Sequence, residues 1–125
     1  MPMFLRVDLT WLLDVAREAL PGDPEVVDFG ALEAARARHG FHVMDTPVYA
    51  HVHDRAAALL HQLVRVPALE HSNELFAASV AAGYLHASGL TVNVSTKEAA
   101  DLVEQAAGGL ADVRQIAAAL KDWTR

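Results

Sequence analysis

Apolar residues recur every three to four positions along most of the chain, which is the spacing of amphipathic α-helices. The clearest case is HDRAAALLHQLVRV, in which Leu59, Leu60 and Leu63 fall on one side. The same spacing predicts helices in TWLLDVAREAL from Thr10, FGALEAARAR after Asp28, ELFAASVAAGYLHAS from near Ser72, TKEAADLVEQAAG after Ser95 and VRQIAAALKDW after Asp112. We therefore predict an all-α fold of about six helices.

The ends of these helices are marked by residues that stop or cap a helix. Prolines and glycines interrupt the pattern at five places, namely Pro21, Gly22, Pro24, Gly40 and Pro67. Asp28 and Asp112 are suitable N-caps, and Ser95 with Glu98 predicts a capping box. The polar run EHSNE, residues 70 to 74, has a structural explanation of the same kind: Ser72 would cap a helix with its hydroxyl group.

Residues 41 to 49, FHVMDTPVY, lack helical periodicity and contain Pro47. We predict a short loop or hairpin at about residues 40 to 49. Its apolar residues alternate only in part with polar ones, so pairing with a partner's strand is a hypothesis. The candidate contact residues are Phe41, Val43, Met44, Val48 and Tyr49.

The length of 125 residues predicts a single domain, 1–125, and an apolar content of 53% is enough for a core. The net charge of −6 argues against nucleic acid as a partner, since Arg36 and Arg38 are close together but follow Glu33 by one turn. The opening MPMFLRVDL lacks the features of a signal peptide, and no apolar run approaches the ~20 residues of a membrane span. We expect a cytoplasmic protein with no membrane partner. Four basic residues are expected to be solvated: Arg6, Arg17, Arg55 and Lys97.

The chain has seven histidines and no cysteine, which excludes disulfides and thiolate metal sites. His51, His53, Asp54 and His61 are the candidate metal ligands. In a helix, however, residues two apart point to different faces, so His51 and His53 would not converge on one ion. We therefore predict no metal site. His61 lies on the apolar side of its helix and is expected to be a hydrogen-bonded core histidine.

The order of these segments resembles the Doc toxins of the Fic superfamily. The resemblance is carried by FLRVDLTWLLDVAREAL, VVDFGALEAARAR, YAHVHDRAAALLHQLVR and GYLHASGLTVNVSTKEAADLVEQAAGG, and it covers nearly the whole chain. It implies a compact six-helix Fic/Doc-like bundle from a bacterial toxin–antitoxin family. Residues 40 to 49 would correspond to the flap with which Fic proteins align a target's chain beside the active site.

Members of that family carry a catalytic loop of the form His-x-Phe-x-Asp-Gly-Asn-Lys-Arg, which falls without gaps on residues 67 to 75. Pro67 stands where the family has its histidine, Leu69 where it has phenylalanine and His71 where it has the acid. A shift by one residue would instead place Val66 at the histidine and Glu70 at the acid. Both alignments lack the general base, a group that typically contributes ~10²- to 10⁴-fold to the rate.

The phosphate-binding half of the motif is changed as well. Ser72 falls at the glycine, and Asn73 keeps the asparagine. Glu74 replaces the lysine and Leu75 replaces the arginine, so the groups that would clamp a triphosphate are absent. Together with Glu70, Glu74 would repel such an anion. The resemblance thus implies a degenerate former catalytic loop, no nucleotide cofactor and no ordinary nucleotidyl or phosphoryl transfer.

Three functional hypotheses remain open. The first is a binding or regulatory pseudoenzyme that holds a protein, such as an antitoxin-like segment or an enzyme subunit, at its flap and cleft. The second is a repurposed enzyme in which Glu70, His71 and Asn73 act as acid/base and polar groups on a small molecule. The third is a toxin–antitoxin relic that binds an antitoxin segment in a groove. Homo-oligomers are compatible with all three. A deep pocket beside His71 would favour the second, and an exposed apolar flap the others.

Overall fold

The computed structural model describes residues 5–125, which form six helices and one two-stranded antiparallel hairpin. The helices are α1 (Leu9–Ala19), α2 (Phe29–His39), α3 (Val52–Arg65), α4 (Asn73–Ala87), α5 (Thr96–Ala107) and α6 (Val113–Trp123). The hairpin consists of β1 (His42–Val43) and β2 (Thr46–Pro47). The first residues of the opening segments quoted above, residues 1–4, lie outside the described part. The predicted all-α fold is confirmed.

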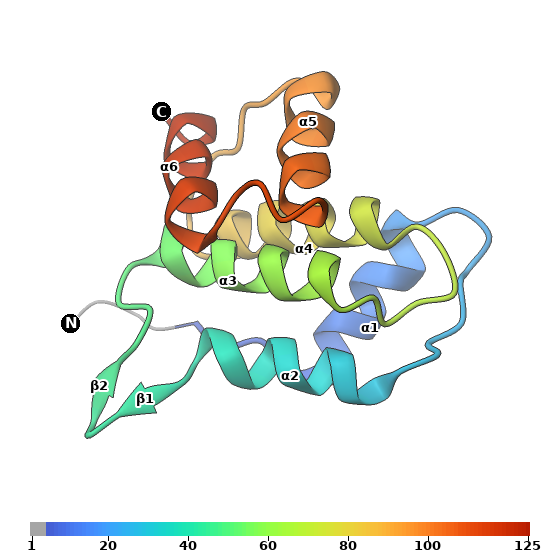
Figure 1. Ribbon diagram of the computed structural model, residues 1–125, viewed down its shortest axis with the longest axis horizontal. Helices are drawn as coiled ribbons and strands as arrows, with labels where there is room; N and C mark the ends of the chain where they lie inside the picture. Colours follow the sequence, from blue (N-terminus) through green and yellow to red (C-terminus); the bar gives the residue numbers. More distant parts are fainter. Residues whose placement is uncertain (1–4) are drawn as a thin grey trace.

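Helix α3 runs through the middle of the bundle and packs against α2, α4, α5 and α6 (Figure 1). Every residue from Arg55 to Leu60 is buried, as expected for a helix that packs against four others. One apolar core contains residues from all six helices. Within residues 5–125, no helix has both the length and the apolarity needed to cross a membrane.

The helix caps agree with the sequence in most places. Asp28 accepts a hydrogen bond from the amide of Ala31, and Asp112 forms a reciprocal capping box with Gln115. The capping box predicted at Ser95 is wrong in one half: its hydroxyl accepts from the Glu98 amide, but the Glu98 carboxylate accepts from that same hydroxyl rather than from the Ser95 amide. The helix start itself is correct.

Among residues 5–125, two polar or charged side chains are buried, those of Arg55 and His39. Arg55, expected to be solvated, is only 5% exposed. Its guanidinium donates to the Tyr84 hydroxyl at 2.8 Å and to the carbonyl oxygens of Tyr49 and Ala50 at 3.2 and 2.8 Å. The expectation of a solvated Arg55 was wrong. Helical spacing shows on which face of the helix a charged residue lies, but it does not show that backbone carbonyls of another segment accept hydrogen bonds from it. Arg55 therefore anchors the chain that leaves the hairpin.

The second buried polar residue is His39, at the end of α2. Its Nε2 accepts a hydrogen bond from the Val7 amide at 3.0 Å, and its Nδ1 donates to the Arg36 carbonyl. Both ring nitrogens are therefore used by a neutral imidazole, which also packs edge-on against Tyr84. Burial is the main cause that lowers the pKa of His39. His39 thus fastens the N-terminal segment to α2.

Candidate functional site

The former catalytic loop predicted at residues 67 to 75 spans the segment between α3 and α4, residues 66 to 72, and the first turn of α4. It is held against the connection between α1 and α2 by backbone hydrogen bonds. Leu69 forms an isolated antiparallel bridge with Val26, and the Glu70 amide donates to the Glu25 carbonyl at 3.0 Å. The Ala68 carbonyl accepts from the amides of residues 27 and 28 at 2.7 and 3.1 Å. The loop therefore has a fixed path.

Asn73 and Ser72 shape the end of this loop. The Asn73 side chain spans the turn, since its Oδ1 accepts from the Leu69 amide at 3.0 Å and its Nδ2 donates to the Leu69 carbonyl at 2.9 Å. Ser72 has φ 64° and ψ 26°, in the left-handed region. Its side chain makes no capping hydrogen bond, so the cap predicted for Ser72 is wrong. A residue with positive φ does not aim its side chain at the first turn as an extended cap does.

Glu70 and His71, the candidate acid–base pair, both lie on the surface. Their side chains are 45% and 48% exposed, and His71 Nε2 is 4.0 Å from Glu70 Oε1. Each has another hydrogen bond: Glu70 Oε1 accepts from the Glu25 amide at 3.0 Å, and His71 Nδ1 is 2.8 Å from the Ser72 hydroxyl. Neither residue lines either of the two cavities described below. The pair is thus open to water on the loop surface.

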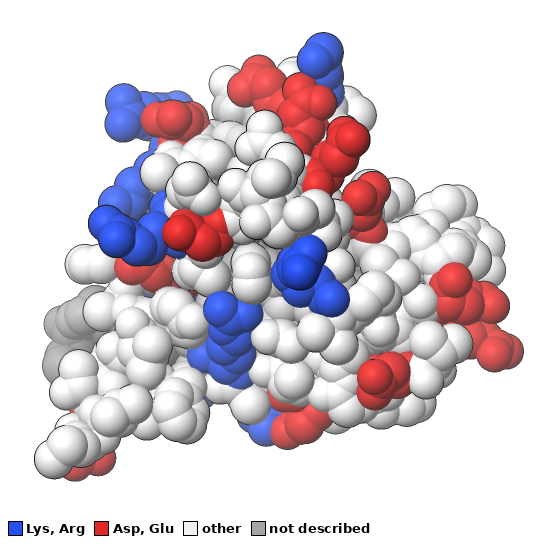
Figure 2. Space-filling view, in the orientation of Figure 1, with Lys and Arg blue, Asp and Glu red and all other residues white. Residues whose placement is uncertain are grey.

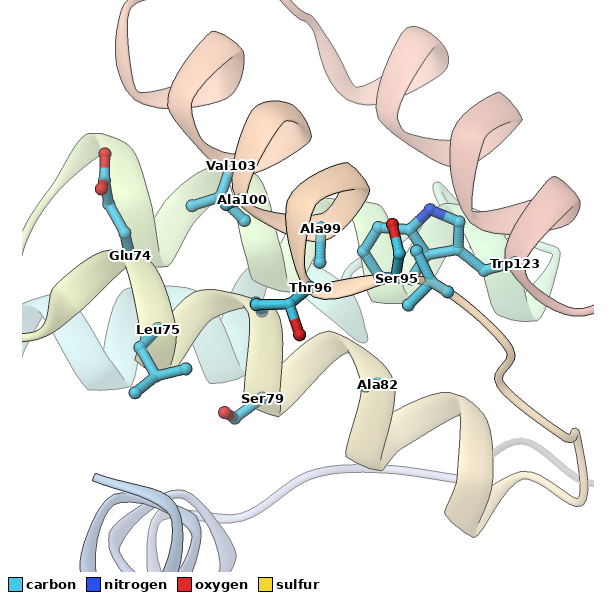
Figure 3. Close-up of a pocket in the computed structure, with 12 residues that line it drawn as sticks. Glu74, Leu75, Ser79, Ala82, Ser95, Thr96, Ala99, Ala100, Val103 and Trp123 are labelled. Atoms are coloured by element: carbon cyan, nitrogen blue, oxygen red, sulfur yellow. The ribbon is translucent and has the colours of Figure 1, made fainter. Parts of the chain in front are cut away.

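A cavity of about 480 Å³ begins beside the loop and follows the seam between α4 and α5 (Figure 3). Glu74 and Leu75 lie at one end, next to the start of α4, and the Trp123 ring lies at the other. The walls between them are mostly small apolar side chains, with Ser79 and Thr96 as polar groups near the middle. Its shape is that of an open groove without a charged floor. A second cavity of about 250 Å³ lies beneath residues 5–8, against Trp11 and Tyr84.

The hairpin lies at the opposite end of α3 from the loop (Figure 1). The 14 residues of α3 separate the two by roughly 20 Å. Four apolar hairpin residues are exposed, and Met44 is 94% exposed at the tip. The four are Phe41, Val43, Met44 and Val48. The structure therefore does not bring the flap candidates and the loop residues together in one site.

Tyr49, the fifth hairpin candidate, belongs instead to a polar cluster at the base of the hairpin. Arg38 in the last turn of α2 donates to the Tyr49 hydroxyl at 3.1 Å and to Gln62 Oε1 at 3.2 Å. The same guanidinium lies 2.9 Å from His61 Nδ1 and 5.9 Å from the centre of the Tyr49 ring. His61 is hydrogen-bonded as predicted but only half-buried. Burial, followed by the charge of Arg38, lowers its pKa.

The candidate metal ligands do not converge. Among residues 5–125 there is no group of three or more histidine, cysteine, aspartate or glutamate side chains that could hold an ion. His53 Nε2 instead forms a hydrogen bond of 2.8 Å with the Thr124 hydroxyl, which ties the start of α3 to the end of α6. Burial also lowers the pKa of His53.

One comparison with known proteins bears on the identity of the chain. The protein named Toxin Doc from Mycolicibacterium smegmatis is 36% identical over 104 residues, which cover 82% of this chain and 80% of that toxin. No protein-family model matches the chain.

Proposed function

Because the chain belongs to the Doc family of the Fic superfamily, we propose that it is a toxin–antitoxin-related protein that binds a protein partner and has lost nucleotidyl and phosphoryl transfer. This proposal rests on one observation: the loop is held in a fixed path, but its side chains are not those that nucleotidyl or phosphoryl transfer requires. Pro67 has no proton to exchange, and residues 67 to 75 contain no lysine or arginine that would hold a phosphate.

The backbone of the loop supports the alignment without gaps. The family's glycine falls on Ser72, which adopts the positive φ that glycine tolerates best. In the shifted alignment the glycine would fall on His71, which does not have positive φ. On this basis Glu74 and Leu75 occupy the positions of the lysine and the arginine. The frame of the motif persists while its chemistry is replaced.

The surroundings of Glu70 and His71 favour binding over a new catalytic activity. A catalytic carboxylate usually works in a pocket that removes it from water. Here both side chains are about half exposed, and Glu70 is engaged by a backbone amide. The apolar surfaces lie elsewhere, at the hairpin and in the groove between α4 and α5. Exposed apolar patches and grooves are typical of protein-binding surfaces.

Calorimetry with ATP, GTP and magnesium tests the loss of transferase chemistry. We expect no heat of binding from the native protein. The informative control restores the family residues at five positions: Pro67→His, His71→Asp, Ser72→Gly, Glu74→Lys and Leu75→Arg. Binding by this variant alone would show that these side chains account for the loss. Magnesium-dependent binding by the native protein would contradict the proposal.

Two charge substitutions distinguish the contact surfaces. Ala99→Arg would place a cation in the groove, and Met44→Asp would place an anion at the hairpin tip, which is solvent-exposed and should tolerate the change. The readout is co-purification with the protein encoded by the neighbouring gene. If only Ala99→Arg abolishes it, the partner lies in the groove; if only Met44→Asp does, it lies on the hairpin. Unchanged co-purification of both variants would contradict binding at either surface.

A further inference from the structure

The cluster at the base of the hairpin contains hydrogen-bond donors that no group in residues 5–125 accepts. The Nε of Arg38 donates to Tyr49, and its Nη1 donates to His61 and Gln62. Its Nη2 has no partner within residues 5–125. The Tyr49 hydroxyl accepts from Arg38 and has its own hydrogen left to donate. Three neutral groups therefore surround a permanent cation without neutralising it.

His61 adds a third unused donor. A guanidinium can only donate, so the Nδ1 atom of His61 must accept from Arg38, and the ring hydrogen of neutral His61 is on Nε2. No group in the described part of the chain accepts it. Since no buried side-chain nitrogen or oxygen in that part lacks a hydrogen-bond partner, Arg38 Nη2 and His61 Nε2 are within reach of solvent. A small ligand could reach them as well.

The charge around this cluster is positive even though the whole chain carries −6. None of the ion pairs between described residues includes Arg38, whereas Arg36 on the same helix is paired with Glu33. Two guanidiniums, Arg38 and Arg65, act on His61, against the single carboxylate of Asp112. In the view of Figure 2, blue atoms lie over the middle, and red atoms lie over α5 and at the right-hand end, with others to the left of the middle and at the lower edge.

We propose that Arg38, Tyr49 and His61 form a binding site for an oxyanion, either a carboxylate or a phosphate group, at the junction of α2, the hairpin and α3. Guanidinium groups with open donors bind both kinds of oxyanion by charge-assisted hydrogen bonds. The site is distinct from the former catalytic loop, because none of its three residues belongs to residues 67 to 75. It therefore does not depend on how residues 67 to 75 are aligned with the family.

Nuclear magnetic resonance on the full chain tests this site with simple anions. Sodium phosphate, sulfate and acetate are titrated at pH 7 against sodium chloride of equal ionic strength. We expect the chemical shifts of the Arg38 Nε–H and His61 ring signals to change and to saturate at millimolar anion concentrations. Saturation with phosphate and sulfate alone would identify a tetrahedral group as the ligand, and saturation with acetate alone would identify a carboxylate. Shifts no larger than those with chloride would overturn the proposal.

Variants separate local binding from general attraction of anions. Arg38→Gln should abolish saturation at His61, and Tyr49→Phe, which keeps the ring, should weaken binding about two- to tenfold through the loss of one donor. Arg36→Gln is the matched control and should leave the affinity unchanged. Either equal affinity of the native protein and Tyr49→Phe or saturation in Arg38→Gln would overturn the site. Because Tyr49→Phe removes only a hydroxyl, the test remains valid if Arg38→Gln does not fold.

Discussion

The two ends of α3 are fixed by opposite means. At its C-terminal end, the loop of residues 66 to 72 is held by backbone hydrogen bonds and by the neutral side chain of Asn73. At its N-terminal end, the chain that leaves the hairpin is held by two guanidiniums: Arg55 donates to the carbonyls of Tyr49 and Ala50, and Arg38 donates to the Tyr49 hydroxyl. A loop held by its backbone can exchange its reactive side chains and keep its shape, whereas the hairpin base depends on particular charged residues.

The largest effect should come from Arg55, the buried anchor of the hairpin end. Arg55→Leu removes three hydrogen bonds from a charged donor and leaves two carbonyl groups without it, so we expect a loss of about 2–4 kcal/mol of unfolding free energy. Urea denaturation measures this. Arg17→Leu, which removes an exposed arginine from an ion pair within α1, should change the stability by no more than about 0.5 kcal/mol. A loss below about 1 kcal/mol for Arg55→Leu would refute its anchoring role.

At the loop end, the corresponding test is Asn73→Ala. This change leaves the amide and carbonyl groups of Leu69 without their partner, at a cost of about 2 kcal/mol. Asn73→Asp keeps an acceptor for the Leu69 amide but no donor for its carbonyl, so its stability should be intermediate. Hydrogen exchange should accelerate at residues 66 to 72 and not at the hairpin. Faster exchange at both ends would show that the two are not independently fixed.

The helices could be predicted from the sequence because their signals are local. Spacing of apolar residues, proline and glycine stops and acidic caps all act within a few positions, and the six predicted helices are present. The apolar spacing predicts the start of α1 at Thr10, one residue late, because the N-cap is Asp8 and the helix begins at Leu9. The lack of helical periodicity and Pro47 predict a loop or short hairpin at residues 40 to 49. They do not predict the strand pairing, in which His42 lies opposite Pro47.

The errors concern what a side chain meets across the fold. Ser72 has the composition of a cap, but its backbone angle depends on the whole turn. Arg55 and His39 are buried against carbonyl and amide groups of segments far away along the chain or outside their own helix. Local sequence signals likewise do not show that the flap candidates and the loop residues lie at opposite ends of α3. A signal for His39 was available: it is the last residue before Gly40, at a helix end where a polar side chain can serve the backbone.

Stability should also respond to acid, and two of the three histidines whose pKa is lowered, His39 and His53, lie toward the hairpin end. Burial lowers the pKa of His39 and, in the same direction, those of His53 and His61. Between the folded and unfolded pKa values the unfolded chain binds more protons, so stability rises with pH there. The contribution is complete above about pH 6.5, the ordinary value, and is lost as the pH falls below it.

Urea denaturation at several values between pH 5 and 8 measures this slope. His39→Gln, whose amide oxygen can still accept from the Val7 amide, should flatten it. His71→Gln, a substitution of an exposed loop histidine, is the control variant and is measured under the same conditions. Identical slopes for the native protein and His39→Gln would refute a role for the buried imidazole.

The smallest effect should be a gain at the loop. At Ser72 the positive φ crowds the Cβ atom against the backbone. Ser72→Gly removes this crowding and should raise the unfolding free energy by about 0.5–1 kcal/mol. Ser72→Ala is the matched control, since it removes the hydroxyl near His71 but keeps the Cβ, and it should give no gain. If glycine is no better than alanine, the backbone at Ser72 is not constrained, and the alignment that places the family's glycine there loses its structural support. If only glycine stabilises, then this loop still prefers the residue found at that position of the family's motif, and the change to serine belongs with the changes at residues 67, 71, 74 and 75 on which the proposed loss of transfer rests.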